Sequence, residues 1–327
     1  MPKVSVIIPV YGVERYIERC ARSLFNQTLD DIEYIFVNDC TLDNSINILK
    51  KVIAEFPNRK NQCIIVNMPM NTGQAGVRRQ GIQLATGNYI IHCDSDDWVK
   101  EDMYKTMYDL AIKNDLDVVL CDYYKSDGKN IKLFHSFSGV EPINKDNALK
   151  YLLNVRISTS IWNKLVRRSV YLDNKIIYPT NNMWEDFVLS SQIFYYCKSV
   201  AYCPIPFYYY FTNMNSICHD NIDKIFIQLQ NNAKLILNFL SEKSIDKKYD
   251  KEIVYFKWYS RSELVPYISQ KKYYNLWLNT YPEINNLYKN NSCFTKMEKF
   301  KFWSMKLKVF PFLSIVASSV KYIFRWI

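Results

Sequence analysis

The chain has 327 residues, 49% of them hydrophobic and 23% charged, which is the composition of an ordinary globular protein with a large core. Its formal net charge is +10, but no helix-turn-helix, RNA-recognition or zinc-finger pattern accompanies that charge, so we expect no nucleic-acid partner. The nine cysteines include no Cys-x-x-Cys pair, which argues against a disulfide framework and a zinc site and indicates reduced thiols in a cytoplasmic protein.

Strand and helix patterns alternate over the first hundred residues. Apolar runs predict four strands, at 4–10, 33–37, 63–68 and 89–93. The segments between them have helical spacing and predict three helices, at 14–27, 44–56 and 74–85. This alternation indicates an α/β fold with a mostly parallel sheet covered on both faces, whose ligands bind beyond the carboxyl ends of the strands.

Three carboxylates follow the fourth predicted strand within four positions. Asp94, Asp96 and Asp97 come where the apolar run ends, at the carboxyl edge of the predicted sheet. Hard divalent cations take oxygen ligands, often one or two carboxylates together with the phosphates of a substrate. The alternative is a turn in which Asp94 and Asp96 cap a helix that begins near Glu101. The residues alone leave both interpretations open.

Short motifs in a fixed order extend from the first strand to residue 217. They are 4–11, 22–24, 26–28, Asn38-Asp39, 43–45, 71–73, Arg78, 81–82, 85–87, 89–90, 94–98, Trp162-Asn163-Lys164-Leu165, Glu185-Asp186, 207–210 and 215–217. In this order they resemble the inverting nucleotide-sugar glycosyltransferases of family 2. The resemblance implies the Rossmann-like GT-A fold for a catalytic domain at 1–220, and it leaves 221–327 as an appended C-terminal helical region.

Six residues would bind the donor nucleotide, and two of them, Asp94 and Ser95, belong to the turn after the fourth predicted strand. By resemblance, Pro9 and Tyr11 would shape the floor under the base and Asp39 would hydrogen-bond it. Arg78 and its neighbour open a predicted helix and could reach the diphosphate, since arginine suits phosphate oxygens, although exposed helix arginines are common. Without the resemblance, Asp39 is equally well explained as a turn residue or helix cap. Asp43 is the more natural cap, which would leave Asp39 free.

The chain departs from the family at three places near these residues. Arg79 stands where the family commonly has asparagine. Family members usually have Asp-Asp-Gly where this chain has Asn38-Asp39-Cys40, and a β-carbon at position 40 restricts any left-handed turn. His92 stands at a position that is normally apolar in the family. We expect His92 to be a hydrogen-bonded core histidine rather than a ligand.

The acid cluster takes the metal-binding role in the resemblance. Asp94, with the adjacent Ser95, would contact the donor, Asp94 at the ribose. Asp96, helped by Asp94, would hold Mn²⁺ or Mg²⁺. The cation would act as a Lewis acid on the diphosphate leaving group, so no protein acid would be needed there.

Glu185 and Asp186 are the candidates for the catalytic base. They follow Trp184 at the start of a probable helix, where the helix dipole lowers the pKa of a carboxylate. We therefore expect Asp186 to be ionised and able to take the proton of an acceptor hydroxyl. Acids at a helix start also simply complement the dipole, and only the resemblance favours catalysis. Trp184 would stack on an acceptor sugar or belong to the core.

The aromatic run 207–211 predicts a further strand. Pro204 and Pro206 lie just before it, and proline removes a ladder donor, so we expect an edge strand. We expect its tyrosines to pack beneath the acceptor site rather than touch the substrate.

Basic residues gather towards the end of the chain. Within 296–310, five lysines surround a stripe with helical spacing, formed by Phe300, Trp303, Leu307 and Phe310. This pattern is typical of an interfacial helix, and it fits equally a helix packed on the catalytic domain or on a second subunit. Peripheral membrane contact through 296–327 and a homo-oligomer therefore both stay open. The apolar run 312–327 is shorter than a bilayer span usually requires.

Together these features predict a cytoplasmic enzyme, either free or peripheral at the inner face of the cytoplasmic membrane. It would transfer a hexosyl group, from a UDP-sugar by resemblance, to a glycan or lipid-linked acceptor of a bacterial surface polysaccharide. The alternative is a catalytically silent subunit of the same fold that binds sugar nucleotide or polysaccharide. A nicotinamide dehydrogenase is excluded because Gly12 stands alone after the first strand, and a P-loop enzyme because no lysine follows Gly81.

Overall fold

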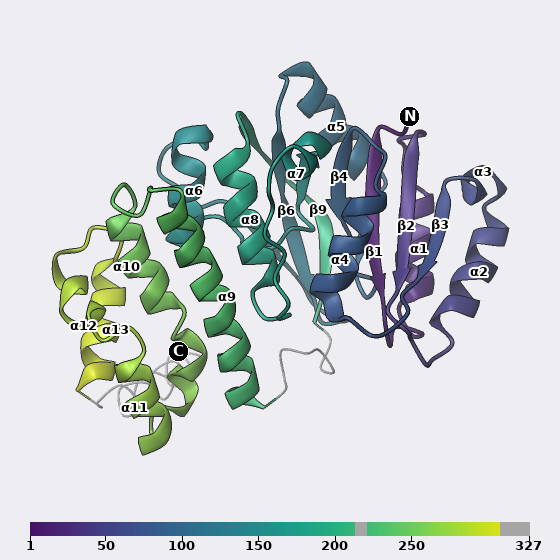
Figure 1. Cartoon of the computed structure of the whole chain (residues 1–327). Coiled ribbons are helices and arrows are strands. Elements are labelled where there is room, and N and C mark those ends of the chain that lie inside the picture. Colours follow the sequence, from purple (N-terminus) through teal and green to yellow (C-terminus); the bar gives the residue numbers. More distant parts are fainter. Residues whose placement is uncertain (213–220, 308–327) are drawn as a thin grey trace, which may run out of the picture. The chain divides into compact units, whose positions relative to one another are not determined.

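The computed structural model describes residues 1–212 and 221–307. The chain divides into two compact units, Met1–His219 and Asp220–Ile327. In the described residues the first unit combines a sheet with helices, and the second is made of helices (Figure 1). The motif at 215–217 and the apolar run 312–327 lie outside the described residues.

A mixed sheet forms the centre of the first unit. Its strands are β1 (Val4–Val10), β2 (Ile32–Asn38), β3 (Cys63–Asn67), β4 (Tyr89–His92), β5 (Trp98–Val99), β6 (Val118–Ser126), β7 (Ile131–Phe134), β8 (Lys164–Arg167) and β9 (Val200–Phe211). Their order is β3-β2-β1-β4-β8-β6-β9-β5, and β7 pairs with β6 outside this path. The first four strands are parallel, as predicted, but β8 runs antiparallel to both of its neighbours, so the sheet is mixed rather than mostly parallel.

Helices cover both faces of this sheet. They are α1 (Ile17–Phe25), α2 (Ser45–Glu55), α3 (Pro57–Lys60), α4 (Gly73–Leu84), α5 (Met103–Lys113), α6 (Lys145–Leu153), α7 (Arg168–Leu172) and α8 (Glu185–Tyr196). One buried cluster joins alternate residues of β1 to α1, α2 and α5. The opposite face of β1 meets α4 so closely that a β-carbon at Gly81 would lie 2.3 Å from Ile7 Cγ2. This close approach sets α4 against the strands that carry the site.

The prediction that 207–211 forms an edge strand was wrong. β9 begins at Val200 and pairs in parallel with β6, while the short β5 pairs with its other side. Pro204 and Pro206 lie inside β9, where the register of the β6–β9 pairing shifts around Asp122. Because the ladder is already irregular there, it does not need an N–H group from either proline.

The second unit packs its helices around an aromatic core. The described elements are α9 (Ile222–Glu242), α10 (Asp250–Tyr259), η2 (Ser262–Tyr267), α11 (Lys271–Asn279), α12 (Ile284–Leu287), η3 (Tyr288–Asn290) and α13 (Lys296–Lys306). The rings of Tyr288 and Phe302 stack with centroids 4.1 Å apart, and Trp277 packs against Phe302. Among the described residues, no helix has the length and apolar character needed to cross a bilayer.

Candidate active site

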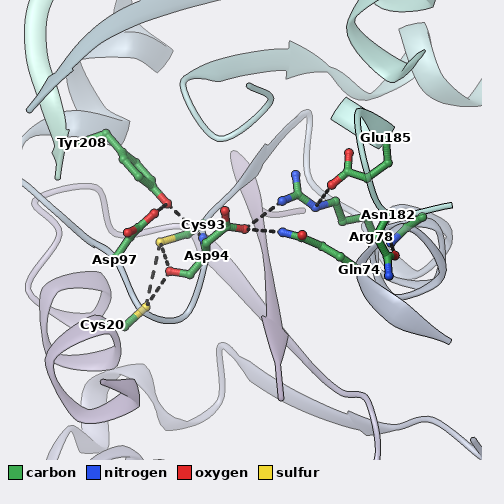
Figure 2. A network of polar contacts seen from close by, with 10 residues as sticks. Cys20, Gln74, Arg78, Cys93, Asp94, Asp97, Asn182, Glu185 and Tyr208 are labelled. Atoms are coloured by element: carbon green, nitrogen blue, oxygen red, sulfur yellow. Dashed lines mark hydrogen bonds and ion pairs between the residues drawn. The ribbon is translucent and has the colours of Figure 1, made fainter. Parts of the chain in front are cut away.

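The acids after β4 form what we call the strand-end cluster, Asp94, Asp96 and Asp97. Asp94 is half-buried, and its Oδ1 accepts hydrogen bonds from Arg78 Nη2 at 2.8 Å and Gln74 Nε2 at 3.2 Å, both on α4 (Figure 2). The alternative in which Asp94 and Asp96 cap the next helix was wrong, because α5 begins only after Asp102, which occupies the cap position.

Asp97 points into the protein rather than towards a ligand. Its carboxylate accepts hydrogen bonds from Tyr208 Oη and from the Phe211 backbone N–H, each at 2.6 Å. The backbone N–H of Asp94 donates to the same Tyr208 oxygen at 3.0 Å (Figure 2). Burial, with help from Asp96 and Asp94, raises the pKa of Asp97 well above its ordinary value. Asp97 therefore fastens the turn to β9, which leaves Asp94 and Asp96 as the candidates for binding.

Arg78 links the strand-end cluster to α8. Its side chain is only 2% exposed, and its Nε lies 3.2 Å from Glu185 Oε1 (Figure 2). Burial works against the charge, but Glu185 and Asp94 more than offset this and raise the pKa of Arg78. The prediction that Arg78 opens its helix was wrong, and so was the picture of an ordinary exposed arginine. It lies in the middle of α4, enclosed with two carboxylates, whereas Arg79 is exposed.

Glu185 and Asp186, the helix-start pair, begin α8 as predicted. The expectation that the helix start lowers the pKa of Asp186 was wrong, because burial raises that pKa and the charges of Arg78 and Lys164 offset burial only in part. Burial also raises the pKa of Glu185 to about 8, against Arg78 and with help from Asp186 and Asp94. One enclosed guanidinium thus faces three carboxylates, so Glu185 tends to keep its proton near neutral pH.

Lys164 is a site candidate to which the sequence analysis gave no role. It is buried in β8, and its Nζ donates to the backbone oxygens of Ser158 and Ser160 and to Asn163 Oδ1. Burial lowers its pKa to about 7, and Asp186 opposes that shift. The available signal was weak, because Lys164 stands at the start of a short strand that ends in Arg167. A buried ammonium needs acceptors and a compensating charge, which the local sequence does not reveal.

Asp39 is not free, contrary to the prediction. Its Oδ1 accepts a hydrogen bond from the Thr72 N–H at 2.7 Å and its Oδ2 from the Gly73 N–H at 2.9 Å, so it supports the loop that leads into α4. Asp43 accepts the Ser45 N–H at the start of α2, but Asn44 rather than Asp43 occupies the cap position of that helix. If Asp39 also contacts the base, its carboxylate must accept a further hydrogen bond or give up one of these two from the backbone.

The other predicted donor-binding residues lie at the same edge of the sheet. Pro9 is near the end of β1, which pairs with both β2 and β4. Tyr11 follows β1 and is exposed, whereas Ser95 is buried inside the turn after β4. Cys40 adopts φ 59°, so the left-handed turn after Asp39 forms even with a β-carbon, at a cost in backbone strain.

The loop before α8 packs on the start of α4. The Ala75 N–H donates to Asn182 Oδ1 at 3.3 Å, and a β-carbon at Gly73 (φ +70°) would lie 2.6 Å from the Asn182 side chain. Trp184 is half-buried, with its ring centroid 5.2 Å from that of Phe187. The loop that leads to Glu185 and Asp186 is thus in contact with the start of the helix that carries Arg78.

His92 is buried at the end of β4, as expected for a core residue. The expectation that it is hydrogen-bonded was wrong, because neither ring nitrogen has a partner among the described residues. Burial and the charge of Arg78 lower the pKa of His92 well below its ordinary value. His92 is therefore a neutral imidazole that adds no charge to the site.

The strand-end cluster suits a divalent cation that shares its ligands with a substrate. Asp94 and Asp96 offer carboxylate oxygens in one turn, and both hydrogen bonds that Asp94 accepts from α4 end on Oδ1. Within residues 1–212 and 221–307, no group of three or more His, Cys, Asp or Glu side chains could hold a metal ion. A divalent cation at this turn would therefore need further ligands beyond the carboxylates of Asp94 and Asp96.

Known proteins resemble this chain over most of its length. Residues 5–174 match the profile described as "Glycosyl transferase family 2". EpsH of Bacillus subtilis (strain 168), named as a glycosyltransferase, is 31% identical over 260 residues, which are 77% of this chain and 73% of EpsH. A protein of Borreliella burgdorferi named cholesterol galactosyltransferase is 26% identical over 331 residues, which are 92% of this chain and 88% of that one.

A solved structure shares the fold. Residues 1–349 of TarS from S. aureus, crystallised in complex with UDP-GlcNAc, match with a TM-score of 0.68 and 18% identity, covering 94% of this chain and 88% of that one. This match confirms the GT-A fold and the C-terminal helical region predicted from the sequence.

Proposed function

This chain belongs to glycosyl transferase family 2 and is a glycosyltransferase, and from that premise we propose that it is an inverting enzyme with a UDP-sugar donor. The acceptor is a hydroxyl group of a glycan or of a lipid-linked molecule. The UDP-GlcNAc bound to TarS supports the donor class. The cholesterol galactosyltransferase, which matches almost the whole chain, supports a hexosyl group and a lipid-bearing acceptor.

One observation carries this proposal: the strand-end cluster and the helix-start pair are joined through Arg78, 2.8 Å from Asp94 and 3.2 Å from Glu185. Inverting transfer needs one group that stabilises the negative charge of the leaving diphosphate and a second that takes the proton of the acceptor hydroxyl. The two acid groups supply these from different elements, β4 and α8, held together by one buried cation.

Asp186 is the proposed general base, with Glu185 beside it. A hydroxyl group is a poor nucleophile until its proton is removed, and a base is most effective when its pKa lies near the working pH. The raised pKa of Asp186 makes it a stronger base than an ordinary aspartate. Glu185, enclosed with Arg78, positions the start of α8 and limits the net negative charge around the base.

Asp96 and Asp94 are the proposed metal-binding residues, and Pro9, Tyr11, Asp39 and Ser95 the proposed contacts of the donor nucleotide. A bound Mn²⁺ or Mg²⁺ would supply Lewis-acid stabilisation of the departing diphosphate. Arg78 is too enclosed to reach a phosphate without moving, so we assign it a positioning role. It fixes Asp94 through Oδ1 and leaves the other carboxylate oxygen for donor or metal.

The setting we propose is the synthesis of a bacterial surface polysaccharide, in the cytoplasm or at the inner face of its membrane. None of the eight described cysteines forms a disulfide, which fits a reducing compartment. Catalysis would belong to residues 1–220, and 221–327 would be the appended helical region. The rival is a silent subunit that binds sugar nucleotide or polysaccharide without turnover.

A panel of nucleotide-sugars tests the proposal directly. Release of nucleoside diphosphate is followed for each donor, with and without added Mn²⁺ or Mg²⁺ and with excess chelator. We expect release from a UDP-sugar that needs a divalent cation. Donor binding without release, for every donor and acceptor tried, would favour the silent subunit. Unchanged turnover in excess chelator would remove the metal from the mechanism.

A further inference from the structure

Helix α13 has apolar side chains on two opposite faces. Phe302 and Met305 point inwards and are buried in the second unit. Met297, Phe300, Trp303 and Leu307 lie on the other side and form what we call the outer face of α13; each is at least 45% exposed. The helix is firmly placed, since Thr295 and Glu298 form a capping box at its start. The outer face is thus a fixed surface of an ordered helix.

The outer face has two stacked aromatic rings at its centre. Phe300 and Trp303, one turn apart, are 49% and 45% exposed, and their rings stack with centroids 5.7 Å apart. Single exposed apolar residues need no explanation, but a contiguous apolar patch marks an interaction site. Tryptophan in such a patch is typical of surfaces that meet the headgroup region of a bilayer.

Positive charge surrounds the outer face. Lys296, Lys299 and Lys301 lie on the same helix, within five residues of one another. The acid of the helix, Glu298, is engaged on the protein, where it accepts hydrogen bonds from Tyr255 Oη at 2.6 Å and Thr295 Oγ1 at 2.8 Å. An apolar face bordered by lysines is complementary to a surface that offers hydrocarbon beneath a layer of negative charge.

We propose that the outer face of α13 docks this protein onto an anionic lipid surface. Phe300 and Trp303 would enter the interface while the lysines meet lipid phosphates. Docking would be peripheral, because no described helix can cross a bilayer. The proposal goes beyond the reaction, since it requires neither donor nor acceptor.

The test is co-sedimentation of the full chain with phosphatidylglycerol–phosphatidylcholine vesicles, compared with phosphatidylcholine alone, at low and high salt. We expect binding to the anionic vesicles at low salt and its loss at high salt. Phe300→Ser with Trp303→Ser should weaken binding by about tenfold or more. Lys299→Gln with Lys301→Gln should weaken it by about 25-fold, as each lysine near such a surface contributes about fivefold.

Matched controls come from the exposed residues Ile227 and Lys234 of α9. Ile227→Ser and Lys234→Gln remove the same kinds of group elsewhere in the second unit, and vesicle binding should stay as in the wild type. Deleting α13 would be uninformative because Phe302 belongs to the core. All variants should keep their nucleoside diphosphate release, so a failed docking test and a failed assignment of the reaction are distinguishable.

Three results would overturn the proposal. The first is a wild-type chain that ignores anionic vesicles at low salt. The second is an aromatic double variant that binds vesicles as well as the wild type. The third is an aromatic double variant that, without lipid, loses thermal stability or changes from a dimer to a monomer. That result would mean that residues 308–327 or a second copy cover the outer face.

Discussion

The two acid groups of the site both consist of carboxylates, but the surroundings of Asp94 and of the helix-start pair differ. In the strand-end cluster, Asp94 is half-buried and takes its hydrogen bonds on one oxygen. In the helix-start pair, Glu185 is enclosed, and burial raises the pKa of both acids. Arg78 serves both groups and cannot neutralise three carboxylates. Burial and the supply of cations, rather than the number of acids, therefore decide which group suits metal binding and which suits proton transfer.

Asp186→Asn is expected to have the largest effect and to separate the role of the helix-start pair from that of the strand-end cluster. This change keeps the shape and removes the base, so transfer should fall by about two to four orders of magnitude while nucleotide affinity stays nearly intact. Steady-state kinetics and a UDP-binding titration measure the two effects separately. If Asp186→Asn were near wild type and Glu185→Gln inactive, the base would belong to Glu185.

Removing the shared cation should destabilise the fold. Arg78→Met leaves Asp94 and Glu185 without their buried partner, which should lower the free energy of unfolding by about 3–5 kcal/mol. The neighbouring Arg79→Met is the matched control, because Arg79 is exposed and its loss should change stability by about 0.5 kcal/mol or less. Denaturant unfolding of the two variants measures the contrast. Equal stability would show that Arg78 does not join the groups.

The strand-end cluster should respond to metal, unlike the helix-start pair. Asp96→Ala should lower turnover by about a hundredfold and weaken the response to added Mn²⁺, because a preorganised electrostatic contact is lost. Asp102→Ala, at the cap position of α5, is the control and should leave the Mn²⁺ titration unchanged. An Asp96→Ala enzyme with normal metal dependence would move the cation away from this cluster.

The fourth prediction concerns pH and stability. Glu185 has a pKa of about 8 in the folded protein against an ordinary value of 4.5, so the folded state binds its proton more tightly. Its contribution to stability is therefore present below about pH 4.5 and is lost as pH rises to about 8. Wild type should lose stability relative to Glu185→Gln across this window. If the difference in stability between wild type and Glu185→Gln does not change with pH, Glu185 is ionised beside Arg78 in the folded protein.

The first half of the fold could be predicted because its elements are local and regular. The strands β1 to β4 and the helices between them are close to their predicted bounds, since apolar runs and helical spacing coincide there. The second half of the sheet, in which parallel and antiparallel strands are mixed, could not be predicted. β8 has four residues, including Lys164 and Arg167, which do not have the pattern of a buried strand. Its antiparallel pairing with β4 and β6 depends on contacts distant in sequence.

The residues of the candidate site were recognisable, but their environments were not. Asp94, Asp96, Glu185 and Asp186 stand out as acids that follow a strand or begin a helix. Nothing in the sequence says that Arg78 is enclosed between two of them, because its burial results from the packing of α4 against the sheet and α8. The raised pKa of Asp186 has the same origin, since local sequence indicates the helix dipole but not the loss of water.

The stereochemistry of the product tests the central claim most directly, because it reports whether a base on α8 and a leaving group at the end of β4 act in a single displacement. The purified enzyme is given an α-linked UDP-sugar with an acceptor on which it turns over. The anomeric configuration of the new bond is then determined by NMR from the coupling of the anomeric proton. Our account predicts a β-linked product. An α-linked product, formed with retention, would contradict it.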